Sequence, residues 1–171
     1  MYNLYYKMAV LLQDNPNRFV LFPIKHDNLW QFYKKAEGSF WTAEEIDMND
    51  DAADWDSLKP SEQDFILKIL GFFAASDGIV IENLLSRFAS EVQLPEARCF
   101  YSFQAAIENI HSEVYSLMIT KFAGSEKKQN ELFRANETHP ATKAKADWAI
   151  KYMTQNENPQ TMDEKVRSFA V

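Results

Sequence analysis

Two long stretches of the chain carry apolar residues around most of the helix circumference instead of on one face. Residues 60–92 open with Pro and Ser, and residues 95–122 open with Pro and end before Ala-Gly, which are typical helix boundaries. A helix of about 30 residues is roughly 45 Å long. One that is apolar on all sides has to be surrounded by other helices. The pattern therefore predicts two core helices, 60–92 and 95–122, inside a large helical bundle.

The rest of the chain predicts shorter elements. An irregular arm is expected over residues 1–26, with an extended-looking stretch at 19–22. Asp27 is expected to cap a helix that runs to about residue 37, before Gly38. The remaining expectations are a short helix or turn with an acidic loop over 39–56, and helices at about 126–136, 141–154 and 162–171.

Composition supports an all-α fold. The chain has 171 residues, of which only 4 are Gly and 6 are Pro, against 13 Phe, 7 Tyr and 4 Trp. So few turn residues argue against many tight β-turns, and the length suits a single helical domain over 1–171. One cysteine excludes an intramolecular disulfide. With no apolar run long enough to span a membrane and no secretory signal pattern, we expect a cytoplasmic protein.

The acidic charge is concentrated in one place. The net charge is -7, and seven acidic residues with no Lys or Arg lie within residues 44–56. No basic stripe appears elsewhere, so a nucleic-acid partner is not expected. Asp47, Asn49 and Asp51 resemble the start of a calcium-binding EF-hand loop, but Ala52 and Leu58 occupy the positions that require Gly and Glu. We expect a solvated acidic loop there.

Four polar residues interrupt the apolar core helices. Asp77 lies within an apolar stripe of the first core helix. Glu108, His111 and Tyr115 follow one another at i, i+3 and i+7 in the second, which places them on one face. Glu-x-x-His is the pair with which helix bundles hold half of a dinuclear carboxylate metal site.

Each of these residues also has an ordinary structural interpretation. Asp77 could accept a local hydrogen bond, the Glu-x-x-His spacing occurs by chance in many helices, and Tyr115 could simply fill the core. Considered together they favour a metal. Antiparallel packing would bring Asp77 and Glu108 together, and two buried carboxylates repel each other without a cation. Iron, manganese and zinc all remain chemically possible.

The sequence around these residues resembles a known family, the small, radical-bearing subunit of class I ribonucleotide reductase in its eukaryotic or viral form. Several long motifs occur in the same order, and the resemblance is high from about residue 15 to 122. The matching stretches are Asn15–Ile24, Lys35–Glu45, Phe72–Gly78, Ala97–Gln104 and Ile107–Tyr115.

The resemblance implies a ferritin-like bundle with a di-iron centre, for which manganese is a possible substitute. Asp77, Glu108 and His111 would hold one iron, and Glu108 would bridge to the second. Tyr115 would carry the stable radical, and Trp41 would join the long-range electron path. The complete small subunit would form a homodimer. Its partner would be the large catalytic subunit, which makes deoxyribonucleotides.

The sequence departs from the family pattern at its end. The family has another Glu and a second Glu-x-x-His in a further half, so we expect this chain to represent the N-terminal half and to be inactive alone. His139 precedes Pro140 and has the wrong spacing, and His26 lies in the irregular arm. We expect Cys99 to be inert core. Two alternatives stay open: a ferritin-like protein that binds or stores iron, and a non-catalytic fragment.

Overall fold

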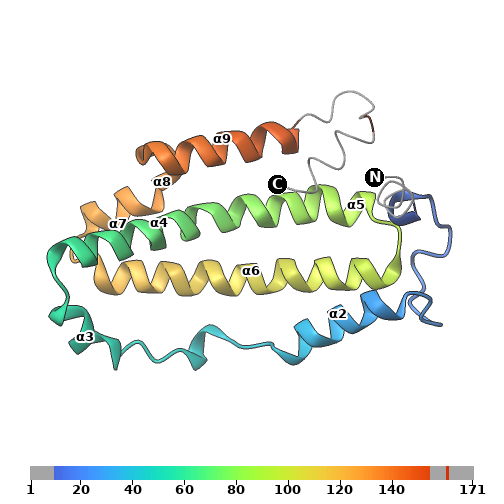
Figure 1. Ribbon diagram of the computed structural model, residues 1–171, viewed down its shortest axis with the longest axis horizontal. Helices are drawn as coiled ribbons and strands as arrows, with labels where there is room; N and C mark the ends of the chain where they lie inside the picture. Colours follow the sequence, from blue (N-terminus) through green and yellow to red (C-terminus); the bar gives the residue numbers. More distant parts are fainter. Residues whose placement is uncertain (1–9, 155–160, 162–171) are drawn as a thin grey trace. The chain divides into compact units, whose positions relative to one another are not determined.

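All regular elements that the structure describes are helices. The structure, a computed structural model, describes residues 10–154 and 161, and no strand occurs within them. The predicted all-α class is therefore confirmed. In chain order the elements are α2 (Asp27–Gly38), the 3-10 helix η1 (Ala43–Glu45), α3 (Asp51–Ser57), α4 (Pro60–Asn83), the π-helix η2 (Leu84–Phe88), α5 (Ala89–Glu91), α6 (Pro95–Phe122), α7 (Glu126–Phe133), α8 (Ala135–Thr138) and α9 (Pro140–Thr154) (Figure 1).

The two long helices begin and end where the sequence pattern places them. Helical structure runs from Pro60 through α4, η2 and α5 to Glu91, and α6 spans Pro95–Phe122. Gly124, just beyond α6, has a φ of 71°, which glycine adopts without the steric cost that a Cβ would bring. The π-helical turn at Leu84–Phe88 was not predicted, because no Pro or Gly marks it.

Three local expectations need correction. Asp27 lies in the first turn of α2, and the N-cap position belongs to His26, whose side chain makes no capping hydrogen bond. The acidic stretch is partly helical, because it contains η1 and most of α3. The arm is not wholly irregular, since residues 10–12 are helical. The helix expected at 162–171 lies outside the described residues.

The chain divides into two compact units. The first contains residues 1–40, 81–107 and 149–171, and the second contains residues 41–80 and 108–148. In the second unit the core cluster is formed by Leu67 and Leu70 of α4, Ile119 of α6, Ala123 just after α6, and Leu132 of α7. Leu67 and Leu70 lie in the cluster with Ile119, Phe73 contacts Tyr115, and Asp77 lies near Glu108, so numbers rise along α4 as they fall along α6 and the two helices are antiparallel here. The antiparallel packing lets Asp77 of α4 approach Glu108 and His111 of α6.

The first unit has its own smaller core. Leu84 and Phe88 of the π-helix pack with Ala105 of α6, and the rings of Phe88 and Tyr101 lie 4.7 Å apart. Described residues cover the apolar sides of the helical stretch 60–91 only in part. Phe65 is 63% exposed and Leu85 is 58% exposed.

Gly71 allows α4 to approach α7 closely. A Cβ at this position would lie 3.1 Å from Leu132 Cδ2 and 3.3 Å from the Leu132 carbonyl oxygen, whereas a Cβ at Gly78 would meet nothing within 4 Å. We expect Gly71→Val to lower the free energy of unfolding by about 1–3 kcal/mol through overpacking. The matched Gly78→Val should change it by less than about 0.5 kcal/mol. Urea denaturation of both variants measures this, and equal stabilities would contradict the close approach.

Candidate metal centre

Asp77 is a buried carboxylate in the middle of α4. The residue is 8% exposed, and its Oδ2 atom is buried without a hydrogen-bond partner among the described residues. Burial and then the neighbouring charge of Glu108 raise the pKa of Asp77 to about 6, while His111 acts in the opposite direction. An unpartnered buried carboxylate is costly, so this position favours a proton or a cation beside it.

Glu108 and His111 face Asp77 from α6. His111 Nδ1 lies 3.0 Å from Glu108 Oε2, and the two side chains are 33% and 17% exposed, respectively. Ligand atoms of Asp77, Glu108 and His111 all lie within 4.8 Å of one another. The structure thus brings together the three residues that the sequence analysis proposed as metal ligands.

This donor set fits a divalent metal ion. It offers two carboxylates and one imidazole, which suit iron, manganese and zinc. The unpartnered Asp77 Oδ2 supplies an oxygen that a cation can bind, and a cation between Asp77 and Glu108 would offset the repulsion between the two carboxylates. Among the described residues, no other group of three such side chains meets the same criterion. The acidic stretch therefore gives no competing site within that part of the chain.

Tyr115 lies beside this group. Its ring centroid is 6.2 Å from that of His111, one helical turn earlier, and it packs against the core cluster of the second unit. Phe73 of α4 stacks on the Tyr115 ring with centroids 5.1 Å apart and planes 21° from parallel. Burial raises the pKa of the Tyr115 phenol, and Asp77 and Glu108 raise it further. The phenol is consequently protonated at neutral pH.

Trp41, which lies between α2 and η1 in the chain, is also close to this group. It precedes η1, where the Thr42 backbone N–H donates to Glu45 Oε1 at 3.0 Å and fixes the turn. The ring centroids of Trp41 and His111 lie 5.7 Å apart. Sequence periodicity could not place Trp41 here, and only the family resemblance singled it out.

Other residues considered from the sequence do not join the group. His139 Nδ1 lies 3.3 Å from Thr142 Oγ1 at the start of α9. Cys99 is half-buried in the first unit, where burial raises the pKa of its thiol. The sequence analysis missed the stacking partner Phe73, although its position one turn before Asp77 was a usable signal.

No helix in the described part of the chain is both long and apolar enough to cross a membrane.

Comparisons with known proteins identify the family. The protein-family model for the ribonucleotide reductase small chain matches residues 18–171. Subunit M2 of ribonucleoside-diphosphate reductase from Homo sapiens is 56% identical over 160 residues, which are 94% of this chain and 41% of that protein. The small chain from Vaccinia virus (strain Ankara) is 58% identical over 146 residues, which are 85% of this chain and 46% of that protein.

A solved structure is similar as well. The ribonucleotide reductase Rnr4 homodimer from Saccharomyces cerevisiae has a TM-score of 0.75 and 35% identity, covering 91% of this chain and 50% of that one. The predicted bundle architecture is thereby confirmed. The chain spans less than half the length of the two curated relatives. The family match and these identities show that the chain belongs to the ribonucleotide reductase small-chain family.

Proposed function

We propose that this chain supplies the metal-binding and radical-bearing part of a ribonucleoside-diphosphate reductase small subunit. One observation carries the proposal: Asp77, Glu108 and His111 converge within 4.8 Å next to Tyr115, a half-buried tyrosine. The protonated phenol of Tyr115 lies beside the ligand His111 and can lose one electron and one proton, a reaction that iron storage alone does not use. The arrangement of Tyr115 favours one-electron chemistry over storage.

Asp77, Glu108 and His111 would hold one metal ion, with Glu108 also available to a second. With dioxygen as the oxidant, the bound metals would supply the chemistry that removes one electron from a nearby side chain. Iron is our first candidate and manganese the second, because both accept carboxylate and imidazole ligands. The described residues offer a full side-chain set to one metal only, so we propose that the remaining ligands come from the further length that the relatives possess.

Tyr115 would store the oxidising equivalent. Because its phenol holds a proton at Oη, removal of one electron from the ring also releases that proton, and a neutral radical remains. Phe73 covers one face of the ring, and the core cluster packs against it, so water has restricted access. The ring is held by packing, and a loss of the hydroxyl would leave that packing largely intact.

We also propose the assembly that the family suggests. The complete small subunit would pair with a second copy and deliver the oxidising equivalent to a separate large subunit, which reduces the nucleotide in the cytoplasm. Residues 1–171 would form one domain of that subunit.

A chimera tests the proposed function. The 160 matching residues of the human M2 subunit would be replaced with those of this chain, and the purified chimera would be given ferrous iron and oxygen. We expect a tyrosyl radical by electron paramagnetic resonance and reductase activity with the human large subunit. A folded chimera that binds iron without forming a radical would support the iron-storage alternative instead.

The proposed electron path through Trp41 gives a separate prediction. In the chimera, Trp41→Phe should leave metal content and the Tyr115 radical intact but lower nucleotide reduction by about tenfold or more, equal to at least 1.4 kcal/mol in the barrier. Phe keeps an aromatic ring at this position but is much harder to oxidise than Trp. Trp55→Phe is the matched control, because Trp55 packs on Phe122 in the same unit with centroids 4.8 Å apart. Equal turnover in the two variants would remove Trp41 from the path.

A further inference from the structure

An open groove lies in the first unit, where the N-terminal arm, α2 and the start of α6 meet. Its volume is about 570 Å³, which is within the range of small-molecule sites. Its lining includes two arginines, a serine and three aromatic residues: Arg18, Phe19, Tyr33, Arg98, Ser102 and Phe103. Among the described residues, no Asp or Glu lines the groove, and none of the proposed metal ligands does.

Arg98 brings an incompletely paired guanidinium to this groove. Its Nη1 donates to the carbonyl oxygens of Ala89 and Val92, in and just after α5. Its Nε and Nη2 have neither a hydrogen-bond acceptor nor a carboxylate partner among the described residues. Neither of these two nitrogens is buried, so a ligand can reach both. Because a half-buried cation is costly without an anion beside it, this position favours a negatively charged ligand.

A second guanidinium, that of Arg18, lines the groove from the arm. Its side chain is 31% exposed, and its Nη1 lies 3.5 Å from Oδ1 of Asp14, whose side chain is 88% exposed. An ion pair this exposed contributes little, so another carboxylate or a phosphate can replace Asp14. Ser102 lies one turn after Arg98 on the same face of α6 and adds an exposed hydroxyl. The groove therefore offers hydrogen-bond donors from the arm and from α6.

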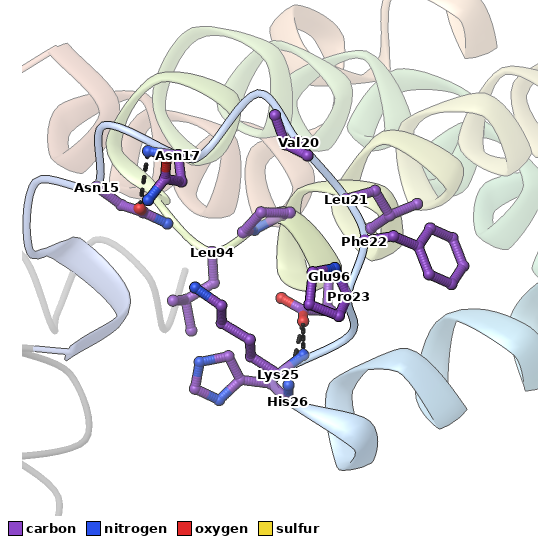
Figure 2. A pocket seen from close by; sticks show the side chains of 11 residues that line it. Asn15, Asn17, Val20, Leu21, Phe22, Pro23, Lys25, His26, Leu94 and Glu96 are labelled. Carbon is purple, nitrogen blue, oxygen red and sulfur yellow. Dashed lines mark hydrogen bonds between the residues drawn. The ribbon is translucent and has the colours of Figure 1, made fainter.

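The buried acid at the start of α6 does not occupy these donors. Glu96 is 1% exposed, and its Oε1 accepts the backbone N–H groups of Lys25 at 2.7 Å and His26 at 3.1 Å, drawn as dashed lines in Figure 2. Burial and then the charge of Glu96 raise the pKa of Cys99, whereas Arg98 acts in the opposite direction, so both charges act on the groove wall. Glu96 does not line the groove, however. A ligand there can contact the Arg98 guanidinium but not the Glu96 carboxylate.

The aromatic wall indicates what the anion is attached to. The rings of Tyr33 and Phe103 meet edge to face with centroids 6.2 Å apart. Phe19 is 76% exposed, and the Arg18 guanidinium lies 4.3 Å from the centroid of its ring. A flat apolar group packed on Phe19 would remove that surface from water. With a net charge of -7, the chain as a whole disfavours an extended polyanion.

We propose that this groove binds a small anion, a carboxylate or a phosphate monoester, that is carried on a flat apolar body. The anionic group accepts hydrogen bonds from Arg98, Arg18 and Ser102. The apolar body packs against Phe19 and Phe103. This site is independent of the proposed metal centre and of the function proposed for it.

Two probes of nearly the same shape test the preference for an anion. The isotopically labelled 171-residue chain would be titrated with 3-phenylpropionate and, separately, with neutral 3-phenylpropanamide, while backbone amide resonances are followed by NMR. We expect saturable shifts centred on the amides of Arg18, Phe19 and Arg98 with the anion, at a dissociation constant on the order of 1 mM, as for a ligand of this size. The neutral probe should bind at least about tenfold more weakly. Equal or tighter binding of the neutral probe would overturn the proposed ligand class.

Phenyl phosphate and inorganic phosphate test the role of the apolar body. Inorganic phosphate lacks the ring that packs on Phe19, so it should bind at least about tenfold more weakly than phenyl phosphate. Comparison of phenyl phosphate with 3-phenylpropionate identifies the preferred anionic group. Equal binding of inorganic phosphate and phenyl phosphate would mean that the aromatic wall takes no part, which contradicts the proposal.

Substitutions of the two arginines test the donors. Arg98→Gln should weaken binding of 3-phenylpropionate at least about tenfold, and Arg18→Gln should weaken it at least about threefold, because each removes a charged donor. Arg134→Gln is the matched control. Arg134 also pairs with a nearby acid, Glu137, but its side chain is 66% exposed and lies outside the groove. The control variant should bind like wild type.

The remaining outcomes are also decisive. If neither anionic probe gives a saturable shift up to about 20 mM, about twenty times the expected dissociation constant, the groove holds only water and the proposal is wrong. Wild-type affinity in both Arg98→Gln and Arg18→Gln would refute it equally. Because Arg18→Gln leaves α6 unchanged, poor folding of the Arg98 variant would not protect the proposal.

Discussion

Tyr115→Phe in the human chimera is expected to abolish the radical signal and to lower nucleotide reduction by more than about 1,000-fold, equal to over 4 kcal/mol of lost catalysis. The substitution removes the Oη hydroxyl, whose proton loss makes a stable neutral radical possible. Phe73 can still stack on the ring, and the core cluster of the second unit can still pack against it. Metal content should therefore match that of wild type.

The control for this variant is Tyr101→Phe. Tyr101 is also a packed tyrosine whose pKa is raised by burial, and its ring lies 4.7 Å from Phe88 in the first unit. We expect full radical yield in that variant, with stability changed by no more than about 1 kcal/mol. A surviving radical in Tyr115→Phe would show that another residue stores the oxidising equivalent.

Asp77→Asn is expected to separate stability from metal binding in the 171-residue chain. Burial and the charge of Glu108 raise the pKa of Asp77 from 3.8 to about 6, so below about pH 3 the folded and unfolded states both hold the proton and the group costs almost nothing. As pH rises, the unfolded state loses the proton first, and stability falls until about pH 6. Above that pH the buried charge costs about 3 kcal/mol in the metal-free chain.

Neutral Asn removes this cost. We expect Asp77→Asn to be more stable than wild type by up to about 3 kcal/mol at pH 7 and no more stable at about pH 3, in urea denaturation without metal. Its affinity for Fe²⁺ or Mn²⁺ should fall at least about 100-fold, since a charged ligand is lost. Asp56→Asn, at an exposed position of α3, should change neither quantity. Loss of stability in Asp77→Asn at pH 7 would mean that Asp77 has a structural role instead.

The sequence predicted the elements that depend on local signals. Pro60, Pro95 and Gly124 mark the helix boundaries, and the i, i+3, i+7 spacing of Glu108, His111 and Tyr115 places them on one face. Antiparallel packing of two apolar helices was enough to predict that Asp77 would meet that face. These inferences need only periodicity and the cost of buried charge, so they hold without any long-range information.

Features that depend on distant residues could not be predicted in this way. Glu96 accepts the backbone N–H groups of Lys25 and His26, just before α2, from about 70 positions away, and the N-cap position falls on His26 instead of Asp27. Trp41 reaches His111 through a loop whose path has no periodic signal. The acidic stretch was expected to be a loop, but acidic residues such as Asp51 and Asp54 favour the first turn of a helix, and α3 forms there.

A paramagnetic titration tests most directly the central claim, that Asp77, Glu108 and His111 form a metal site beside Tyr115. Mn²⁺ would be added in small amounts to the isotopically labelled chain, and NMR line broadening would be mapped for wild type and Asp77→Asn. We predict that broadening in wild type is strongest at Asp77, Glu108, His111 and Tyr115, and that it is lost from these residues in the variant. Broadening centred on the acidic residues 44–56, or equal broadening at the four residues in both proteins, would contradict the claim.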